Sequence, residues 1–119
     1  MMTGIVLARL CLAAVFLYSG VDKLVHWRGT LAEVESYRLP AVPACAALTI
    51  VVQIAGGLMV AVGYYAGLGA LLLAAFTVAA TLAAHRFWEK SGDEFRHGLT
   101  VSLEHLAIVG GLLMIVLLA

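Results

Sequence analysis

Four long apolar stretches dominate this sequence, at residues 3–20, 42–62, 66–84 and 101–119. A bilayer core takes about 20 mostly apolar helical residues to cross, and each stretch comes close to that length. Hydrophobic residues make up 64% of the chain, whereas soluble domains hold roughly 45–50%. The sequence therefore predicts an all-α fold, a four-helix transmembrane bundle in which residues 1–119 form a single domain surrounded by lipid.

The first apolar stretch resembles a secretory signal, but its details favour a retained span. Residues 1–8 contain no Lys or Arg, Arg9 interrupts the apolar run, and no A-x-A cleavage site follows it.

The balance of charges argues against nucleic-acid binding. Seven Lys and Arg balance seven Asp and Glu, so there is no net positive field to attract nucleic acid. Cys11 and Cys45 lack the spacing of a zinc site or a dithiol pair and are expected to pack as small apolar side chains.

The connections between the apolar stretches differ sharply in charge. The two long loops, residues 21–41 and 85–100, hold six Lys and Arg, whereas the short hairpin around Gly63 holds none. Because cytoplasmic loops are enriched in Lys and Arg, this asymmetry predicts cytoplasmic long loops in a multi-pass protein of the cell (inner) membrane. Both termini would then face outward.

The first long loop contains the pattern of a short interfacial helix. Thr30 followed by Glu33 matches a capping box, and Trp27 and Tyr37 are suited to the membrane surface. Prolines at 40 and 43 are expected to end this helix and to begin the second span, where missing backbone donors do least harm.

Each predicted span has one side marked by polar or small residues on a 3.6-residue repeat, and that side is expected to face the bundle. The marked residues are Arg9, Ala13, Phe16, Gly20 and Lys23; Thr49, Gln53, Gly57 and Tyr64; Gly67, Ala74, Thr81 and His85; and Glu104 with Gly111. The pair Gly56-Gly57 would let a neighbouring helix approach closely.

Arg9 and Gln53 are the candidate ligand-binding residues. Arg9 lies about 9 Å into its span, where a charge costs roughly 3 kcal/mol. One hypothesis is that Arg9 binds the polar head of a quinone, lipid or anionic ligand. The alternative is a structural role, in which its side chain extends toward the near membrane surface or bonds to Gln53. Gln53 lies near the midplane, where an amide can join helices as a structural hydrogen bond. A pair of the two would be a deep polar site.

A second group of polar residues is expected to converge at the opposite membrane face: Asp22, Lys23, His85, Glu104 and His105. Two imidazoles there could handle protons or bind a metal. Within this group no His and Glu stand three apart on one helix as in di-iron bundles, and the neighbours Glu104 and His105 point about 100° apart. Interfacial salt bridging is therefore favoured, no metal is expected, and no catalytic residue is assigned.

Short motifs in a fixed order resemble the DoxX family of small four-helix membrane proteins across nearly the whole chain. They are Arg9-Leu10, Ser19-Gly20-Val21-Asp22-Lys23-Leu24, Leu39-Pro40, Gln53-Ile54-Ala55-Gly56-Gly57-Leu58 with Gly63, Ala84-His85-Arg86-Phe87-Trp88, Glu104-His105-Leu106-Ala107 and Gly110-Gly111-Leu112-Leu113. The family commonly has an acidic residue where Gln53 stands. A proton relay at this position is therefore not expected.

The resemblance implies membrane redox work, since one relative is a subunit of a thiosulfate:quinone oxidoreductase and others join oxidative-stress complexes. It supplies no catalytic residue. Three functions follow as hypotheses. The first is an accessory or anchoring subunit of a quinone-linked redox complex with a soluble or membrane partner. The second is a small transporter, permeation or lipid-binding protein, which would require a homo-oligomer for transport. The third, a self-sufficient enzyme, rests only on the His85, Glu104 and His105 group.

Overall fold

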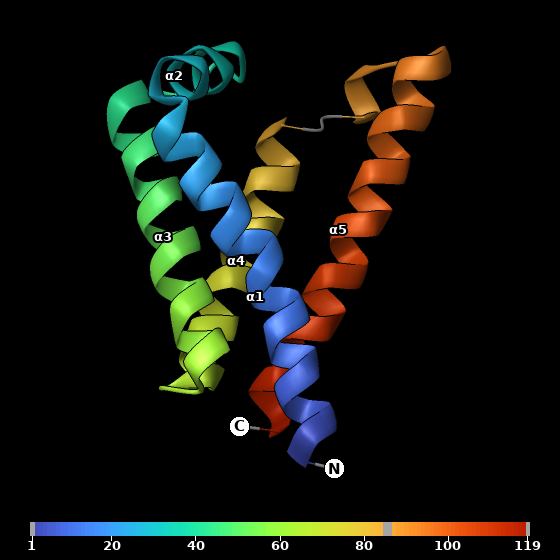
Figure 1. Ribbon diagram of the computed structural model, residues 1–119. Helices are drawn as coiled ribbons and strands as arrows, with labels where there is room; N and C mark the ends of the chain where they lie inside the picture. The colour runs from blue at the N-terminus through green and yellow to red at the C-terminus, as the bar shows by residue number, and fades with distance from the viewer. Residues whose placement is uncertain (1, 85–86, 119) are drawn as a thin grey trace.

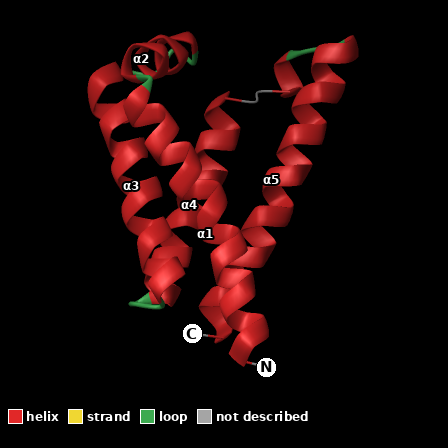
Figure 2. Cartoon of the chain, in the orientation of Figure 1, coloured by secondary structure: helices red, strands yellow, loops and turns green. Residues whose placement is uncertain are grey.

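A computed structural model describes residues 2–84 and 87–118. Its elements are α1 (Met2–Val25), α2 (Trp27–Ser36), α3 (Val42–Val62), α4 (Ala66–Ala84), the short 3-10 helix η1 (Phe87–Glu89) and α5 (Gly92–Leu118). Figure 2 shows these helices joined by short loops, with no strand in the described part of the chain. The predicted all-α fold is confirmed, and α1, α3, α4 and α5 are each long and apolar enough to cross a membrane.

The two ends of the bundle differ in how tightly the helices meet. Both termini and the α3–α4 turn lie at one end, the terminus end, and α2 and η1 lie at the other, the loop end (Figure 1). α1 packs on α3, α3 on α4 and α4 on α5, while α1 and α5 share only a small contact. Figure 1 shows α1 and α5 meeting near the termini and diverging toward the loop end.

Two helices extend beyond the apolar stretches that predict them. α3 and α4 coincide with residues 42–62 and 66–84, but α1 continues past residue 20 to Val25 and α5 begins at Gly92 rather than at 101. Hydrogen bonding within a helix does not stop where the apolar residues stop. At the start of α5, Asp93 and Glu94 occupy the first turn, where negative charge favourably meets the helix dipole.

The interfacial helix predicted in the first loop is confirmed as α2, but its capping box is wrong. α2 begins at Trp27 with His26 as its N-cap residue, so Thr30 lies inside the helix. The Thr30 hydroxyl donates to the backbone oxygens of His26, at 3.1 Å, and Lys23, at 2.9 Å. Because α1 runs on to Val25, the turn falls at His26, and Thr30 fastens α2 to the end of α1 instead of capping α2.

Glycines bring α3 and α4 into close contact. A Cβ added to Gly69 would lie 2.8 Å from Met59 Cβ and 3.1 Å from the backbone oxygen of Gly56, and one added to Gly56 would lie 2.9 Å from Leu73 Cγ. The hydrophobic core lies mostly beside this contact, in the terminus half: Ala13, Phe16, Val60, Ala66, Ala70, Leu73, Ala74, Leu112 and Ile115. Small residues at this crossing therefore set how closely the helices can pack.

The close contact predicts unequal effects for two glycine-to-alanine changes. Gly69→Ala should lower the free energy of unfolding by about 1–3 kcal/mol, because backbone and Cβ atoms must move apart to admit the methyl group. Gly110→Ala is the matched control, since a Cβ there meets nothing within 4 Å and alanine favours the helix by up to about 1 kcal/mol. Unfolding in mixed detergent micelles would measure both. Equal stabilities for the two variants would contradict the packing at Gly69.

Candidate functional site

A cavity of about 440 Å³ occupies the loop half of the bundle and is lined by all five α-helices. Its lining residues are Val15, Phe16, Ser19, Lys23, Thr30, Glu33, Val34, Tyr37, Leu39, Cys45, Leu48, Thr49, Gln53, Phe76, Thr77, Ala79, Ala80, Thr81, Ala83, Ala84, His105 and Ile108. Most of these side chains are apolar. The cavity therefore suits a largely apolar molecule that has a small polar part.

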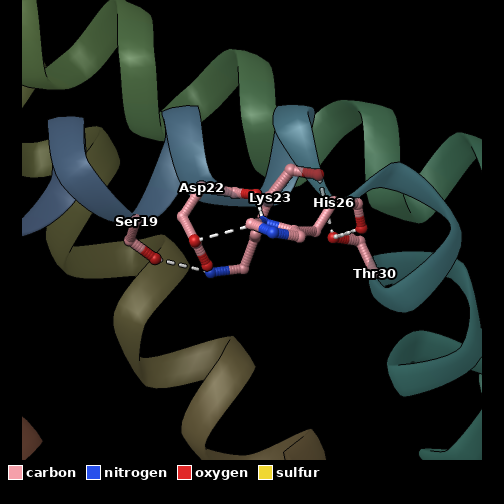
Figure 3. Close-up of polar contacts among 5 residues, drawn as sticks. All are labelled: Ser19, Asp22, Lys23, His26 and Thr30. Atoms are coloured by element: carbon pink, nitrogen blue, oxygen red, sulfur yellow. Dashed lines mark hydrogen bonds and ion pairs between the residues drawn. The ribbon is translucent and has the colours of Figure 1, made fainter.

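One wall of the cavity carries a polar group built from α1 and α3. Lys23 Nζ donates to Ser19 Oγ at 2.5 Å, and Gln53 Nε2 donates to the same oxygen at 3.2 Å. Figure 3 shows the lysine side chain directed back along α1 toward Ser19. Gln53 is buried, with 5% of its surface exposed, and its Oε1 atom has no hydrogen-bond partner among the described residues. A buried amide oxygen without a donor is costly, so this wall carries unused hydrogen-bonding capacity.

The facing polar groups come from α4 and α5. The hydroxyl of Thr77 donates to the backbone oxygen of Leu73 at 2.7 Å. The hydroxyl of Thr81 donates to the backbone oxygen of Thr77 at 2.7 Å. His105 Nδ1 lies 2.8 Å from Thr81 Oγ1. His105 and Thr81 also line a second cavity of about 140 Å³ between α4 and α5. An imidazole is thus held between the two helices at the side of the main cavity.

α2 covers the loop end of the cavity. Thr30, Glu33, Val34 and Tyr37 all face it from this helix or its C-terminal cap, and Thr30 and Val34 are buried. The Tyr37 hydroxyl donates to Glu33 Oε1 at 2.6 Å. Burial, together with this bond to a carboxylate, raises the pKa of Tyr37 well above its usual range. Tyr37 therefore stays protonated and donates a hydrogen bond to the Glu33 carboxylate at the rim of the cavity.

Arg9 and Gln53 do not form the pair considered from the sequence. Gln53 bonds to Ser19, whereas the Arg9 guanidinium lies against Gly63, at the terminus end of α3. Gly63 lies ten residue steps beyond Gln53, which corresponds to about 15 Å along the axis of α3. Arg9 is half-buried, and its Nε atom finds no hydrogen-bond partner in the part of the chain that the structure describes. Its long side chain reaches toward the surface nearest to it, as a charged side chain near a span's end does.

The predicted polar cluster at the loop end is brought together only in part. Lys23 and His105 line the cavity from different helices. Asp22 is exposed and its carboxylate lies 3.3 Å from His26 Nδ1, outside the cavity lining (Figure 3). Glu104 is exposed, so the predicted inward position for it is wrong. The side chain that faces inward is its neighbour His105, and His85 lies outside the described residues.

Several residues of the cavity were missed from the sequence. Ser19 joins the polar groups of α1 and α3, and Thr77 continues the hydroxyl row below Thr81. Both carry a readable signal, since Ser19 precedes Lys23 by four residues and Thr77 precedes Thr81 by four. Residues four apart lie on the same side of a helix. The contribution of Tyr37 could not be read this way, because it depends on where α2 lies over the bundle.

Comparison with known proteins identifies relatives of this chain. A family model described as DoxX matches residues 4–86. Inner membrane protein YphA of Escherichia coli (strain K12) is 20% identical over 111 residues, which cover 93% of this chain and 79% of that protein. No solved structure matches the chain. The family match spans α1 to α4 and thus every cavity residue except His105 and Ile108.

The hydrogen bonds of the cavity wall predict which residues are energetically coupled. In double-mutant cycles on the free energy of unfolding, Ser19→Ala and Gln53→Leu should be non-additive, with a coupling of about 0.5–3 kcal/mol, because their side chains touch. Arg9→Met and Gln53→Leu should be additive, because they lie far apart. A coupling in the second cycle as large as in the first would contradict the separation of Arg9 from Gln53 along the bundle.

Proposed function

This chain belongs to the DoxX family of multi-pass membrane proteins, and from that premise we propose that it is an accessory or anchoring subunit of a membrane redox complex whose cavity holds a quinone head group. The observation that supports this most is the cavity in the loop half, with polar groups on facing walls and apolar side chains between them. A quinone has the matching form, a flat apolar ring with a carbonyl oxygen at each of two opposite positions.

The chemistry of the lining residues fits such a ring. Lys23 on α1 and Gln53 on α3 each donate one N–H to Ser19 and keep at least one further N–H, and His105 supplies an imidazole from the α5 side. α4 contributes alanines at positions 79, 80, 83 and 84, whose small side chains leave a smooth surface for a flat ring. A quinone, when bound, accepts electrons and protons. The part of this chain is to hold the head group and to exclude water from it.

We assign the loop end to the cytoplasm and the protein to the cell (inner) membrane. The excess of Lys and Arg in the two long loops supports this orientation, and the similarity to an inner membrane protein supports the location. The exposed side chains of the loop end include Arg28, Glu35, Lys90, Asp93 and Glu94. A soluble redox partner would dock on this charged end, next to the cavity that α2 covers.

Lipid binding is the second candidate function, because an apolar cavity with a polar wall also fits a lipid head group. Permeation through one copy of the chain is disfavoured. Val60, Leu73 and Leu112 are completely buried in the terminus half of the bundle, so packed side chains lie between the cavity and the terminus end.

Native purification tests the proposal. The chain should be extracted from its own host membrane in a mild detergent, and bound quinones and lipids should be quantified by mass spectrometry together with copurifying proteins. Quinone should be recovered with the wild type and reduced about three- to tenfold in Gln53→Leu and in His105→Leu, the worth of one hydrogen bond. Glu104→Gln is the matched control, since Glu104 is exposed beside His105. A wild type that carries phospholipid and no quinone would refute the quinone site and favour lipid binding.

A further inference from the structure

Lys23 is a cation that faces into the bundle rather than out of it. It is half-buried near the end of α1, where a long side chain could extend toward water. Instead its Nζ atom bonds to Ser19 Oγ, one turn deeper in the helix, and the residue lines the main cavity. Figure 3 shows the lysine side chain lying along α1 with its nitrogen at Ser19. The ammonium group is therefore presented to whatever occupies the cavity.

No carboxylate in the described part of the chain neutralises this ammonium. The ion pairs found within 4.0 Å there join His26 to Asp22 and Arg38 to Glu89. Asp22 is adjacent to Lys23 in sequence, but its carboxylate lies beside His26. Glu33 also lines the cavity and forms no ion pair with Lys23; it accepts the hydrogen bond from Tyr37. Within residues 2–84 and 87–118, the side chain of Lys23 has a single polar contact, with the neutral hydroxyl of Ser19.

A half-buried charge without a counter-charge is unfavourable. Removing an ammonium from water costs free energy that a hydroxyl repays only in part, whereas an opposite charge at hydrogen-bond distance repays much more. The groups that share the hydrogen bonds at Ser19 Oγ, the Gln53 amide and the hydroxyl itself, carry no charge, and the Glu33 carboxylate that also lines the cavity forms no ion pair with Lys23. The residues around the ammonium thus leave the negative charge to be supplied by the ligand.

We propose that the cavity selects lipophilic molecules with a monoanionic head, and that Lys23 is the residue that sets this selectivity. The proposal rests on the proposed function in taking the cavity as the site of a membrane-soluble ligand, and it adds the charge of the head group. Two sources share this chemistry, an acidic quinone with an ionised ring hydroxyl and a fatty acid carboxylate. In both, the anionic oxygen accepts a hydrogen bond from Lys23 Nζ, and the apolar body lies against the alanines of α4.

The test compares pairs of ligands in which one oxygen is ionised in one member and methylated, hence neutral, in the other. Full-length protein in lipid nanodiscs would be dialysed at pH 7.5 against a 2-hydroxy-3-alkyl-1,4-naphthoquinone, which is ionised, and against its neutral 2-methoxy ether. A second pair is palmitate and methyl palmitate. Empty nanodiscs correct for partition into lipid. Wild type should bind the anionic member of at least one pair about tenfold more tightly, since a hydrogen bond to a charged group is stronger than one to a neutral group.

Variants assign the preference to one residue. Lys23→Met should abolish the difference within the pair, and Lys23→Arg should retain it. Lys90→Met removes an exposed lysine between η1 and α5 and should leave the preference unchanged. Equal binding of both members by the wild type would overturn the proposal without any variant, and so would a preference that survives in Lys23→Met.

The two ligand pairs separate this proposal from the proposed function. Tight binding of both naphthoquinones without a preference for the anion would leave the quinone site standing and refute the charge selectivity. Binding of palmitate alone, lost in Lys23→Met, would support the selectivity and identify the cavity as a fatty acid site instead of a quinone site.

Discussion

The close contact of α3 with α4 at Gly56 and Gly69 controls the shape of the whole bundle. The backbone oxygen of each glycine lies within van der Waals reach of the Cβ position of the other, so these helices approach as near as backbones permit. In a membrane, where lipid is as apolar as the helix surface, such packing is a main source of association. Near this contact the terminus half closes around a dense core, and the helices separate only beyond it.

The cavity follows from that arrangement. α1 is held to α3 along their length, as shown by Gly20 close to Ile54 and Gly57 close to Leu17. α5 follows α4 instead and meets α1 near Leu12 and Gly111, in the terminus half. Beyond this meeting point, α1 and α5 diverge (Figure 1), and space remains between α1, α3 and α4. Several polar side chains of the spans line this space, among them Ser19, Lys23, Gln53, Thr77 and Thr81.

Much of this fold could be predicted from the sequence, because hydrophobicity and small residues act locally. The spans at residues 42–62 and 66–84 are bounded by Pro43 and Gly63, and Gly63 ends α3 in a left-handed conformation with its N–H donated to the Met59 oxygen. The inward stripe of α1 was also predictable, since Ala13, Phe16 and Gly20 are buried. These features depend on residues within a few turns of one another.

The candidate site was less predictable, because it depends on rotation and register between helices. Glu104 and His105 are neighbours, and the sequence does not say which of them turns inward; the packing of α5 on α4 selects His105 by placing it at Thr81. Depth alone suggested that Arg9 could meet Gln53, but the register of α1 on α3 sets Leu17 against Gly57 and Gly20 against Ile54, and it therefore places Arg9 at Gly63.

The connection between α2 and α3 shows how the loop end is held in place over the cavity. Arg38 and Ala41 adopt left-handed backbone conformations, with φ of 59° and 51°, which side chains other than glycine adopt at a cost. Such a conformation persists only when surrounding contacts enforce it. The connection has hydrogen bonds of its own, since the Arg38 N–H donates to the Glu35 oxygen at 3.0 Å and the Cys45 N–H donates to the Ala41 oxygen at 3.0 Å, and Arg38 forms an ion pair with Glu89 at 3.6 Å. α2 is held at the loop end of the cavity by the buried Thr30 and Val34 and by the bonds from Thr30 to the end of α1.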